Sequence, residues 1–346
     1  MKKIIALGLV TILLLTAAGC SENEKDEKSN TKDKPQETLV IYTGRSLDLI
    51  EPIVKDFTKE TNIKVELRDG DSGELASQII TEGKNSKADL FFSQDAGALG
   101  LLSERGLLQK LPTDLTKDVS PKFKSPKNEW VGTSGRARVI VYNNELAGDD
   151  IPTSIEDLVS EKYKGKVAYA PTNASFHSFV TALRVTLGEE KAEDWLKKFS
   201  ENEPKAYEKN GAIVKAVNDG EIAFGLVNHY YIYELGAEIG TENLKAENIF
   251  LKDGSAGSLI NAAGLGVLKT SKNQSNAEKF VKYLLSDKGQ EYFVNETFEY
   301  PVISGIKQAE NLPSLEELNA PDIDLSDLKT LDKTLELLDK VGLITK

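Results

Sequence analysis

The feature that most restricts the fold is a repeated order of short apolar run, small polar loop and amphipathic segment. The apolar runs are TLVIY (38–42), ADLFF (88–92), KVAYA (166–170) and IAFGLV (222–227). Each run has the length and composition of a buried strand, and each is followed by helix-like spacing of apolar residues. Strands that alternate with helices predict an α/β fold with largely parallel sheets.

The loops that follow these runs are rich in polar residues. They read TGRS (43–46), SQDAG (93–97), PTNAS (171–175) and NHYY (228–231). In open α/β sheets, ligands bind outside the carboxyl ends of the strands, where these loops lie by construction. We therefore expect the four loops to form one composite binding site.

Two longer apolar segments stand between the blocks of strand and helix. RARVIVYN (136–143) and NAAGLGVLK (261–269) are predicted to be strands that cross between two lobes. Near the end of the chain, leucines recur at three- and four-residue steps, which predicts an amphipathic helix packed on a lobe. These leucines are Leu328, Leu331, Leu335 and Leu338.

The start of the chain is predicted to lie outside the fold. Residues 1–19 combine two lysines, an apolar stretch and the small residues Ala-Ala-Gly, which is the pattern of a secretory signal. The single cysteine of the chain, Cys20, follows directly and resembles the lipidated cysteine of bacterial lipoproteins, where fatty acids such as palmitate are attached. Residues 20–37 have no aromatic or aliphatic side chain after Cys20, so we expect a flexible, lipid-anchored tether.

Composition excludes several classes of function. The formal net charge of −12 and the lack of a basic stripe argue against a nucleic-acid partner. One cysteine and two histidines in 346 residues exclude a Cys/His zinc site and a disulfide framework. We expect no catalysis, because the chain has neither a Gly-x-Ser-x-Gly elbow nor a His-Glu-x-x-His motif.

Two adjacent tyrosines, Tyr230 and Tyr231, follow the last of the four apolar runs. In a regular strand their side chains would point to opposite faces, but at a turn from strand to helix both can face one point. Phenolate oxygens suit a small, hard cation. The alternative is a pair of interface aromatics that cover the end of a strand.

The order and spacing of several segments resemble the ferric iron-binding proteins of bacterial iron ABC transporters, which have the two-lobed type II periplasmic-binding-protein fold. The resemblance extends from residue 38 nearly to the end of the chain. Its segments are VIYTGRS, GDSGELASQIITEG, ADLFFSQDAGALGLLSERGLL, WVGTSGRARVIVYN, YKGKVAYAPTNASF, NGAIVKAVNDGEIAFGLVNHYY, GSLINAAGLGVL and AEKFVKYLLSDKGQEYF.

The resemblance implies roles for individual residues. Tyr230 and Tyr231 match the tyrosines whose phenolates bind Fe(III). The positions that match residues around an accompanying anion, such as phosphate or carbonate, are Asn173, Ala174, Ser175, Asn210, Asn228 and Asp95. Independently, N–H groups at the helix starts after TGRS and PTNAS favour an anion, and Arg45 could add charge.

This sequence departs from the family pattern at three positions. Ser46 stands where one subgroup has a ligand histidine, Gln94 where it has a ligand glutamate, and His177 where another subgroup has a third tyrosine. An external anion, a chelate or water would then complete the metal shell. Ser46 and Gln94 could hydrogen-bond that anion or water, or be ordinary polar residues of a helix N-cap and a loop. His177 could be a direct ligand, a neighbour of one or an exposed helix residue.

Three further residues near the expected site are predicted to be structural. Arg136 and Arg138 lie in or near a crossover strand and are expected to form ion pairs. His229 precedes the tyrosine pair and is expected to point to the other side of the turn. Arg45 itself could also be an ordinary solvated surface arginine.

Together these observations predict a monomeric, extracytoplasmic iron(III)-binding lipoprotein on a Gram-positive cell membrane, with an ABC permease and its ATPase as partners. The expected lobes are residues 38–136 plus 262–308 and residues 137–261 plus 309–346. The same fold could instead carry another cargo, such as phosphonate or a small organic solute. A secreted metallohydrolase is the remaining alternative.

Overall fold

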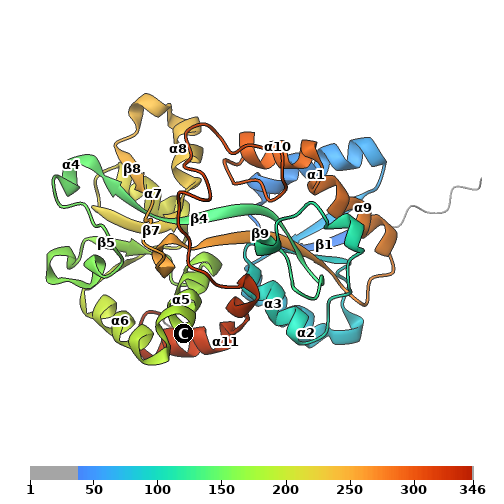
Figure 1. Cartoon of the computed structure of the whole chain (residues 1–346), viewed down its shortest axis with the longest axis horizontal. Helices are drawn as coiled ribbons and strands as arrows, with labels where there is room; N and C mark the ends of the chain where they lie inside the picture. The colour runs from blue at the N-terminus through green and yellow to red at the C-terminus, as the bar shows by residue number, and fades with distance from the viewer. Residues whose placement is uncertain (1–37, 345–346) are drawn as a thin grey trace, which may run out of the picture. The chain divides into compact units, whose positions relative to one another are not determined.

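The computed structural model of the protein describes residues 38–344. Its longer elements alternate in the predicted manner (Figure 1). In order they are β1 (Leu39–Thr43), α1 (Leu47–Thr61), β2 (Val65–Asp69), α2 (Ser72–Glu82), β3 (Leu90–Ser93), α3 (Ala96–Glu104), β4 (Val131–Asn143), α4 (Asn144–Ala147), β5 (Val167–Tyr169), α5 (Ala174–Leu187), α6 (Glu189–Glu201), β6 (Lys205–Ala206), α7 (Asn210–Asn218), β7 (Phe224–Asn228), α8 (Tyr231–Ile239), β8 (Ala246–Ile249), β9 (Ile260–Val267), α9 (Gln274–Leu284), α10 (Asp287–Asn295) and α11 (Leu331–Lys340).

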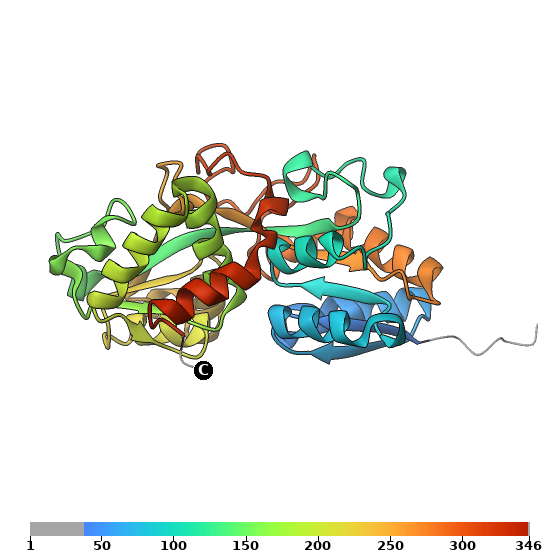
Figure 2. The same cartoon turned by 90° about the horizontal axis from the view of Figure 1, so that it is seen from below.

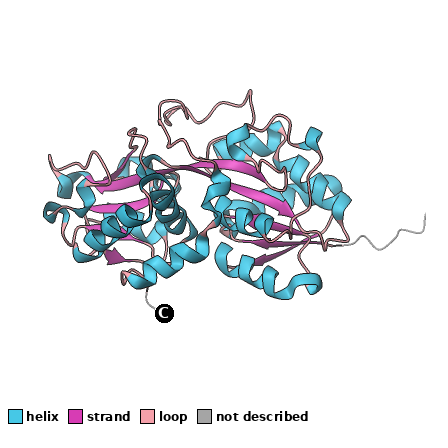
Figure 3. Cartoon of the chain, turned by 60° about the horizontal axis from the view of Figure 1, so that its bottom comes forward, coloured by secondary structure: helices cyan, strands magenta, loops and turns pink. Residues whose placement is uncertain are grey.

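The strands are hydrogen-bonded in the order β2-β1-β3-β9-β4-β7-β5-β6, and β8 also pairs with β4. The pairs β1–β2, β1–β3, β5–β6 and β5–β7 are parallel, whereas β9 and β4 run antiparallel to their neighbours. Helices flank the strands, which Figure 3 shows in magenta. The predicted α/β architecture with mixed sheets is therefore confirmed.

Strand β4 divides this arrangement into two lobes. Its first part, Val131–Ala137, pairs with β9, and its second part, from Arg138 onward, pairs with β7. We call the side with β1, β2, β3 and β9 the first lobe, and the side with β5, β6, β7 and β8 the second lobe. In Figure 1, β4 and β9 run through the middle of the described residues, as expected for crossover strands.

Strand β4 begins five residues before the predicted start at residue 136. The preceding segment contains Gly132 and Gly135, and glycine is depleted in strands, so its pattern does not resemble a strand. A Cβ atom on Gly132 would lie 2.8 Å from the carbonyl oxygen of Phe123. Glycine is present there because another part of the backbone approaches closely, not because the chain turns.

The predicted C-terminal helix is present as α11, but it begins at Leu331; Leu328 lies before it, in a short 3₁₀ helix at Leu325–Lys329. Figure 2 shows α11 in red beside the helices of the second lobe, and its contacts include α5. Within residues 38–344, no helix combines the length and apolar composition needed to cross a membrane. The predicted signal, Cys20 and the tether lie outside the described residues.

Candidate functional site

A cleft of about 830 Å³ lies between the two lobes. The first lobe contributes the loop after β1, the loop between β2 and α2, and Gln94 at the end of β3. The second lobe contributes the start of α5, part of α7 and the first turns of α8. All four predicted loops thus line one cleft. The loops after β1, β3 and β5 contribute directly, and the loop after β7 contributes Tyr231.

The two tyrosines lie at the turn from β7 to α8. Asn228 ends the strand, Tyr230 has helical φ and ψ of −72° and −23°, and Tyr231 begins the helix. Their ring centroids are 4.3 Å apart, with an angle of 32° between the planes. Both rings therefore leave the turn on the same side, as the sequence predicts for a pair that breaks the alternation of a strand.

The two phenol groups have different surroundings. Tyr231 lines the cleft, and burial followed by the neighbouring Tyr230 raises its pKa well above the usual value. Tyr230 is fully buried. Its oxygen nevertheless faces the other lobe, because it accepts a hydrogen bond from Nε2 of Gln94 at 2.9 Å.

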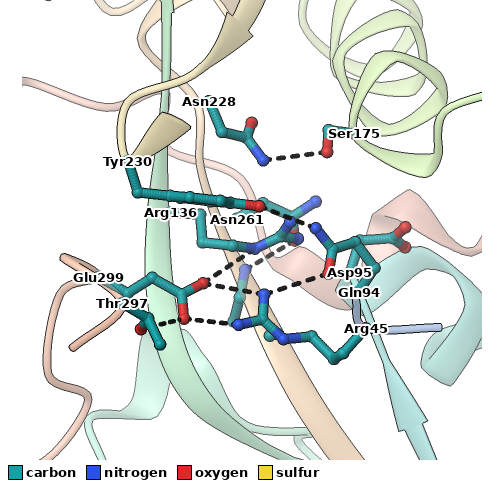
Figure 4. Close-up of polar contacts among 12 residues, drawn as sticks. Arg45, Gln94, Asp95, Arg136, Ser175, Asn228, Tyr230, Asn261, Thr297 and Glu299 are labelled. Atoms are coloured by element: carbon teal, nitrogen blue, oxygen red, sulfur yellow. Dashed lines mark hydrogen bonds and ion pairs between the residues drawn. The ribbon is translucent and has the colours of Figure 1, made fainter. Parts of the chain in front are cut away.

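Gln94 belongs to a buried polar chain, which Figure 4 shows. Its Oε1 accepts a hydrogen bond from Nη1 of Arg45 at 3.1 Å. Arg45 also donates to both carboxylate oxygens of Glu299, at 3.0 and 2.7 Å. Arg45 is 1% exposed, so the alternative of a solvated surface arginine is wrong.

Two more arginines bring unpaired donors to the base of the site. All three guanidinium nitrogens of Arg136 are buried without a hydrogen bond, and its only close carboxylate oxygen in the described residues belongs to Glu299, at 4.0 Å. Arg138 donates from Nη2 to the carbonyl oxygen of Leu226, and its other nitrogens are unpaired.

The expected structural ion pair is therefore wrong for Arg138. Burial, followed by the positive charge of Arg136, lowers the pKa of Arg138 to about 9. Of the three buried arginines, Arg45 and Arg136 lie within ion-pairing distance of one carboxylate, Glu299. The base of the site thus has unpaired hydrogen-bond donors on Arg136 and Arg138, which a bound anion or phenolate oxygens could satisfy.

Amide and hydroxyl groups connect the start of α5 to the end of β7. Nδ2 of Asn228 donates to Oγ of Ser175 at 3.0 Å (Figure 4). Oδ1 of Asn173 accepts from the backbone N–H of Ser175 at 3.0 Å and caps the helix. Asn210 is fully buried; its Nδ2 lies 3.4 Å from Oδ1 of Asn173, and its own Oδ1 has no partner.

Four other predicted residues lie near this cluster with separate contacts. Ser46 and Ala174 line the cleft, and Ser46 is exposed. Asp95 is buried and caps α3 by accepting from the N–H groups of Gly97 and Ala98. His177 makes a 2.7 Å contact from Nε2 to the carbonyl oxygen of Pro171. Their roles at a ligand stay predictions.

His229 has no free ring nitrogen. Its Nδ1 accepts from the N–H of Ala137 at 3.1 Å, and its Nε2 lies 2.8 Å from the carbonyl oxygen of Phe298. Burial lowers its pKa to about 4. The histidine thus joins β4, β7 and the segment after α10.

Sequence patterns did not point to two acidic residues at the site. Glu299 lies 254 residues from Arg45 in the chain, in a segment without a motif. Glu234 lines the cleft one turn into α8, and helical spacing from Tyr230 and Tyr231 could have suggested it. Burial and the charge of Glu299 raise the pKa of Glu234 to about 8, and its Oε1 has no partner.

Within residues 38–344, no group of three or more His, Cys, Asp or Glu side chains could hold a metal ion. The available donors are oxygen atoms, from Tyr230, Tyr231 and Glu234, and oxygen ligands fit a hard cation.

Comparisons with known proteins agree with this geometry. The family model described as bacterial extracellular solute-binding protein matches residues 85–328. The chain is 34% identical over 308 residues to the Fe(3+)-binding periplasmic protein of Serratia marcescens. The aligned region covers 88% of this chain and 90% of that protein. It is 33% identical to the major ferric iron-binding protein of Neisseria meningitidis, with 88% and 93% covered.

Solved structures show the same fold. Iron-bound HitA from Pseudomonas aeruginosa has a TM-score of 0.84 and 33% identity, covering 88% of this chain and 99% of that one. The Trichodesmium protein (IdiA, FutA) in complex with iron and citrate has a TM-score of 0.73 and 31% identity, also covering 88% and 99%.

These neighbours have the type II periplasmic-binding-protein fold, which confirms the predicted fold class. The matched relatives are binding proteins and not enzymes, as the sequence predicts. The chain belongs to the bacterial extracellular solute-binding proteins, and among them it is similar to the ferric iron-binding members.

Proposed function

We propose that the protein captures ferric iron in the cleft between its lobes, outside the cytoplasm, and delivers it to an ABC importer. The observation that carries this proposal is the tyrosine pair: two rings leave the β7–α8 turn on one side, 4.3 Å apart, and one of them lines the cleft. The relatives named for ferric iron binding support it.

The chemistry of the site suits a trivalent ion. Tyrosine is protonated at neutral pH, and burial raises the pKa of Tyr231 further, so the empty site holds a neutral phenol there. A trivalent cation stabilises the phenolate and displaces the proton. Iron binding should therefore release protons and become weaker as the pH falls.

An anion bound together with the iron is the finer part of the proposal. The unpaired nitrogens of Arg136 and Arg138 offer donors and charge that two phenolates do not exhaust. Phosphate or carbonate would fit this donor set, since both present several acceptor oxygens. Arg45 is less available, because Glu299 and Gln94 occupy its Nη1 and Nη2.

The same arginines favour a second candidate, in which an anion alone is the cargo. Buried donors without partners would bind a phosphonate or an organic acid even if the tyrosines only covered the strand end. The two candidates differ in one property: only iron bound by phenolate produces a charge-transfer band in the visible spectrum.

The test is a titration of metal-free protein with ferric citrate, followed by visible absorption and by elemental analysis after gel filtration. We expect a coloured complex for the wild type, a weaker or shifted band for Y230F and Y231F, and no band for the double variant. Tyr233 provides a matched control on the same helix, since its ring packs on Phe298 and it does not line the cleft. Y233F should therefore keep the band. A colourless wild type that binds phosphate or phosphonate would contradict iron binding and support the second candidate.

We further propose that residues 1–19 are a secretion signal and that lipidated Cys20 anchors the protein to the outer face of the cell membrane. The lobes would comprise residues 38–136 plus 262–308 and residues 137–261 plus 309–346. The change of partner within β4 between Ala137 and Arg138 supports the first of these boundaries. Rotation of the lobes about the crossover strands would open and close the cleft.

A further inference from the structure

The hydrogen bond between Gln94 and Tyr230 has a defined direction. A side-chain amide nitrogen can only donate, so the phenol oxygen of Tyr230 is the acceptor in the 2.9 Å contact with Nε2 of Gln94. Both side chains are shielded from water, since Gln94 is 6% exposed and Tyr230 is fully buried. The bond also joins the end of β3 in the first lobe to the β7–α8 turn in the second.

The orientation of the Gln94 amide is fixed from its other side. Its Oε1 accepts from Nη1 of Arg45 at 3.1 Å, and a guanidinium has no acceptor. Rotating the amide by half a turn would place its NH₂ group against the guanidinium, donor against donor. Gln94 must therefore present its nitrogen to Tyr230.

Arg45 is held in turn by a carboxylate. Glu299 accepts from both terminal nitrogens of Arg45, at 3.0 and 2.7 Å, and also from the hydroxyl of Thr297 at 2.9 Å. Such paired, charge-assisted hydrogen bonds are geometrically specific. Glu299 is fully buried, so the chain Glu299–Arg45–Gln94–Tyr230 lies in a water-poor setting where each bond is strong.

We propose that Gln94 is a positioning residue for the metal-binding oxygen of Tyr230, held in its donating orientation by Arg45 and Glu299. This inference rests on the proposed iron function and describes how a hydrogen bond sets the position and electron energy of one iron ligand, Tyr230. The amide keeps one hydrogen bond on the phenolate when the metal is bound, and the remaining lone pairs of that oxygen face the cargo. Gln94 is then a donor to a ligand and not a metal ligand itself.

A hydrogen bond to a phenolate lowers the energy of the electrons that it would transfer to Fe(III). Removing the bond should therefore move the charge-transfer band to lower energy, which a residue with a merely structural role would not do. Hydrogen bonds to charged groups are comparatively strong, so the affinity for iron should also fall by about tenfold or more.

The experiment compares the visible spectrum and the ferric citrate affinity of the full chain in wild type, Q94L and Q94N. Q94L removes the donor at similar volume. Q94N keeps an amide but shortens the side chain by one methylene, which withdraws the donor from Tyr230, and it serves as the second variant if Q94L does not fold. Both should form a coloured complex with a band at lower energy and with weaker affinity.

A matched control is Gln290 of α10, a fully buried glutamine whose Nε2 donates to the carbonyl oxygens of Thr133 and Leu284. Q290L should lower thermal stability without moving the band. If the wild type is coloured and the Q94L or Q94N band stays at the wild-type position, the positioning role is wrong and iron binding stands. If the wild type forms no band, the proposed function and this inference fail together.

Discussion

At the scale of single residues, the buried histidine next to the tyrosine pair illustrates how position sets protonation. His229 accepts from one backbone N–H through Nδ1, so its proton resides on Nε2, which donates to the carbonyl oxygen of Phe298. Burial lowers its pKa to about 4, although the hydrogen bond to Phe298 and the charge of Glu299 act in the opposite direction. The folded protein therefore keeps His229 neutral under conditions in which the unfolded chain would protonate it.

This difference predicts a pH-dependent stability. Above pH 6.5 both states carry a neutral His229, so its contribution is fully present; as the pH falls from 6.5 to about 4, the unfolded state binds the proton first and stability is lost. The loss should total about 3 kcal/mol. Urea unfolding of iron-free protein at several pH values measures it, and H229Q should show a flatter dependence. Parallel curves for the two proteins would contradict the assignment.

Some site residues could be predicted from their neighbours in the sequence, and others could not. The tyrosine pair, Gln94 and Ser175 follow predicted strands, and the sheet edge brings their loops together. The partner of Arg45 could not be predicted, because Glu299 is 254 residues away and belongs to no pattern. Sequence spacing also does not reveal whether a charged side chain is buried. From the sequence alone, Arg45 could therefore be a surface residue and Arg138 a member of an ion pair.

At the scale of elements, hydrophobic patterns predicted β1, β3, β5 and β7 and the helix that follows each of them. Strand β7 is buried throughout, and α1 buries Leu49, Ile50, Ile53, Val54 and Phe57 on one face. The start of β4 was missed because it contains glycines, and these are required by close contacts with other parts of the chain. Local patterns cannot register such a tertiary contact.

The pairing of β4 with β9 requires a second glycine that another part of the backbone approaches closely. A Cβ atom on Gly264 would lie 2.6 Å from the carbonyl oxygen of Val131 and 3.0 Å from Cδ1 of Leu99. The backbone of a paired strand cannot move away easily, so we expect G264A to destabilise the protein by roughly 1–3 kcal/mol. Thermal unfolding followed by circular dichroism measures this loss.

The control for that substitution is Gly73, which lies in α2 with negative φ. Its added Cβ would meet only Cδ2 of Leu331, at 3.4 Å, which is ordinary contact. G73A should leave stability unchanged or raise it by about 0.5–1 kcal/mol, since alanine favours the helix. A G264A protein as stable as G73A would show that the two crossover strands can separate at little cost.

At the scale of the whole molecule, the described fold begins with a strand that is paired on both sides. Leu39 of β1 aligns with Val65 of β2, and Ile41 aligns with both Leu67 of β2 and Leu90 of β3. We therefore predict that residues 38–344 suffice for cargo binding in the cleft. If residues 1–37 act as signal and tether, anchoring and cargo binding should be separable properties.

The substitution C20S tests this separation in the complete chain. Without a thiol, the lipid that would hold the protein at the membrane cannot be attached, and each buried CH₂ of such a lipid contributes about 0.8 kcal/mol to membrane binding. We expect the wild type in the membrane fraction, labelled by an alkyne analogue of palmitate, and C20S unlabelled in the medium. Secreted C20S should bind ferric citrate with the affinity of detergent-extracted wild type, because the substitution changes none of the residues that line the cleft. Retention of C20S on the membrane would show that another part of the molecule makes the attachment, and a loss of iron affinity in C20S would show that the first 37 residues contribute to the cleft.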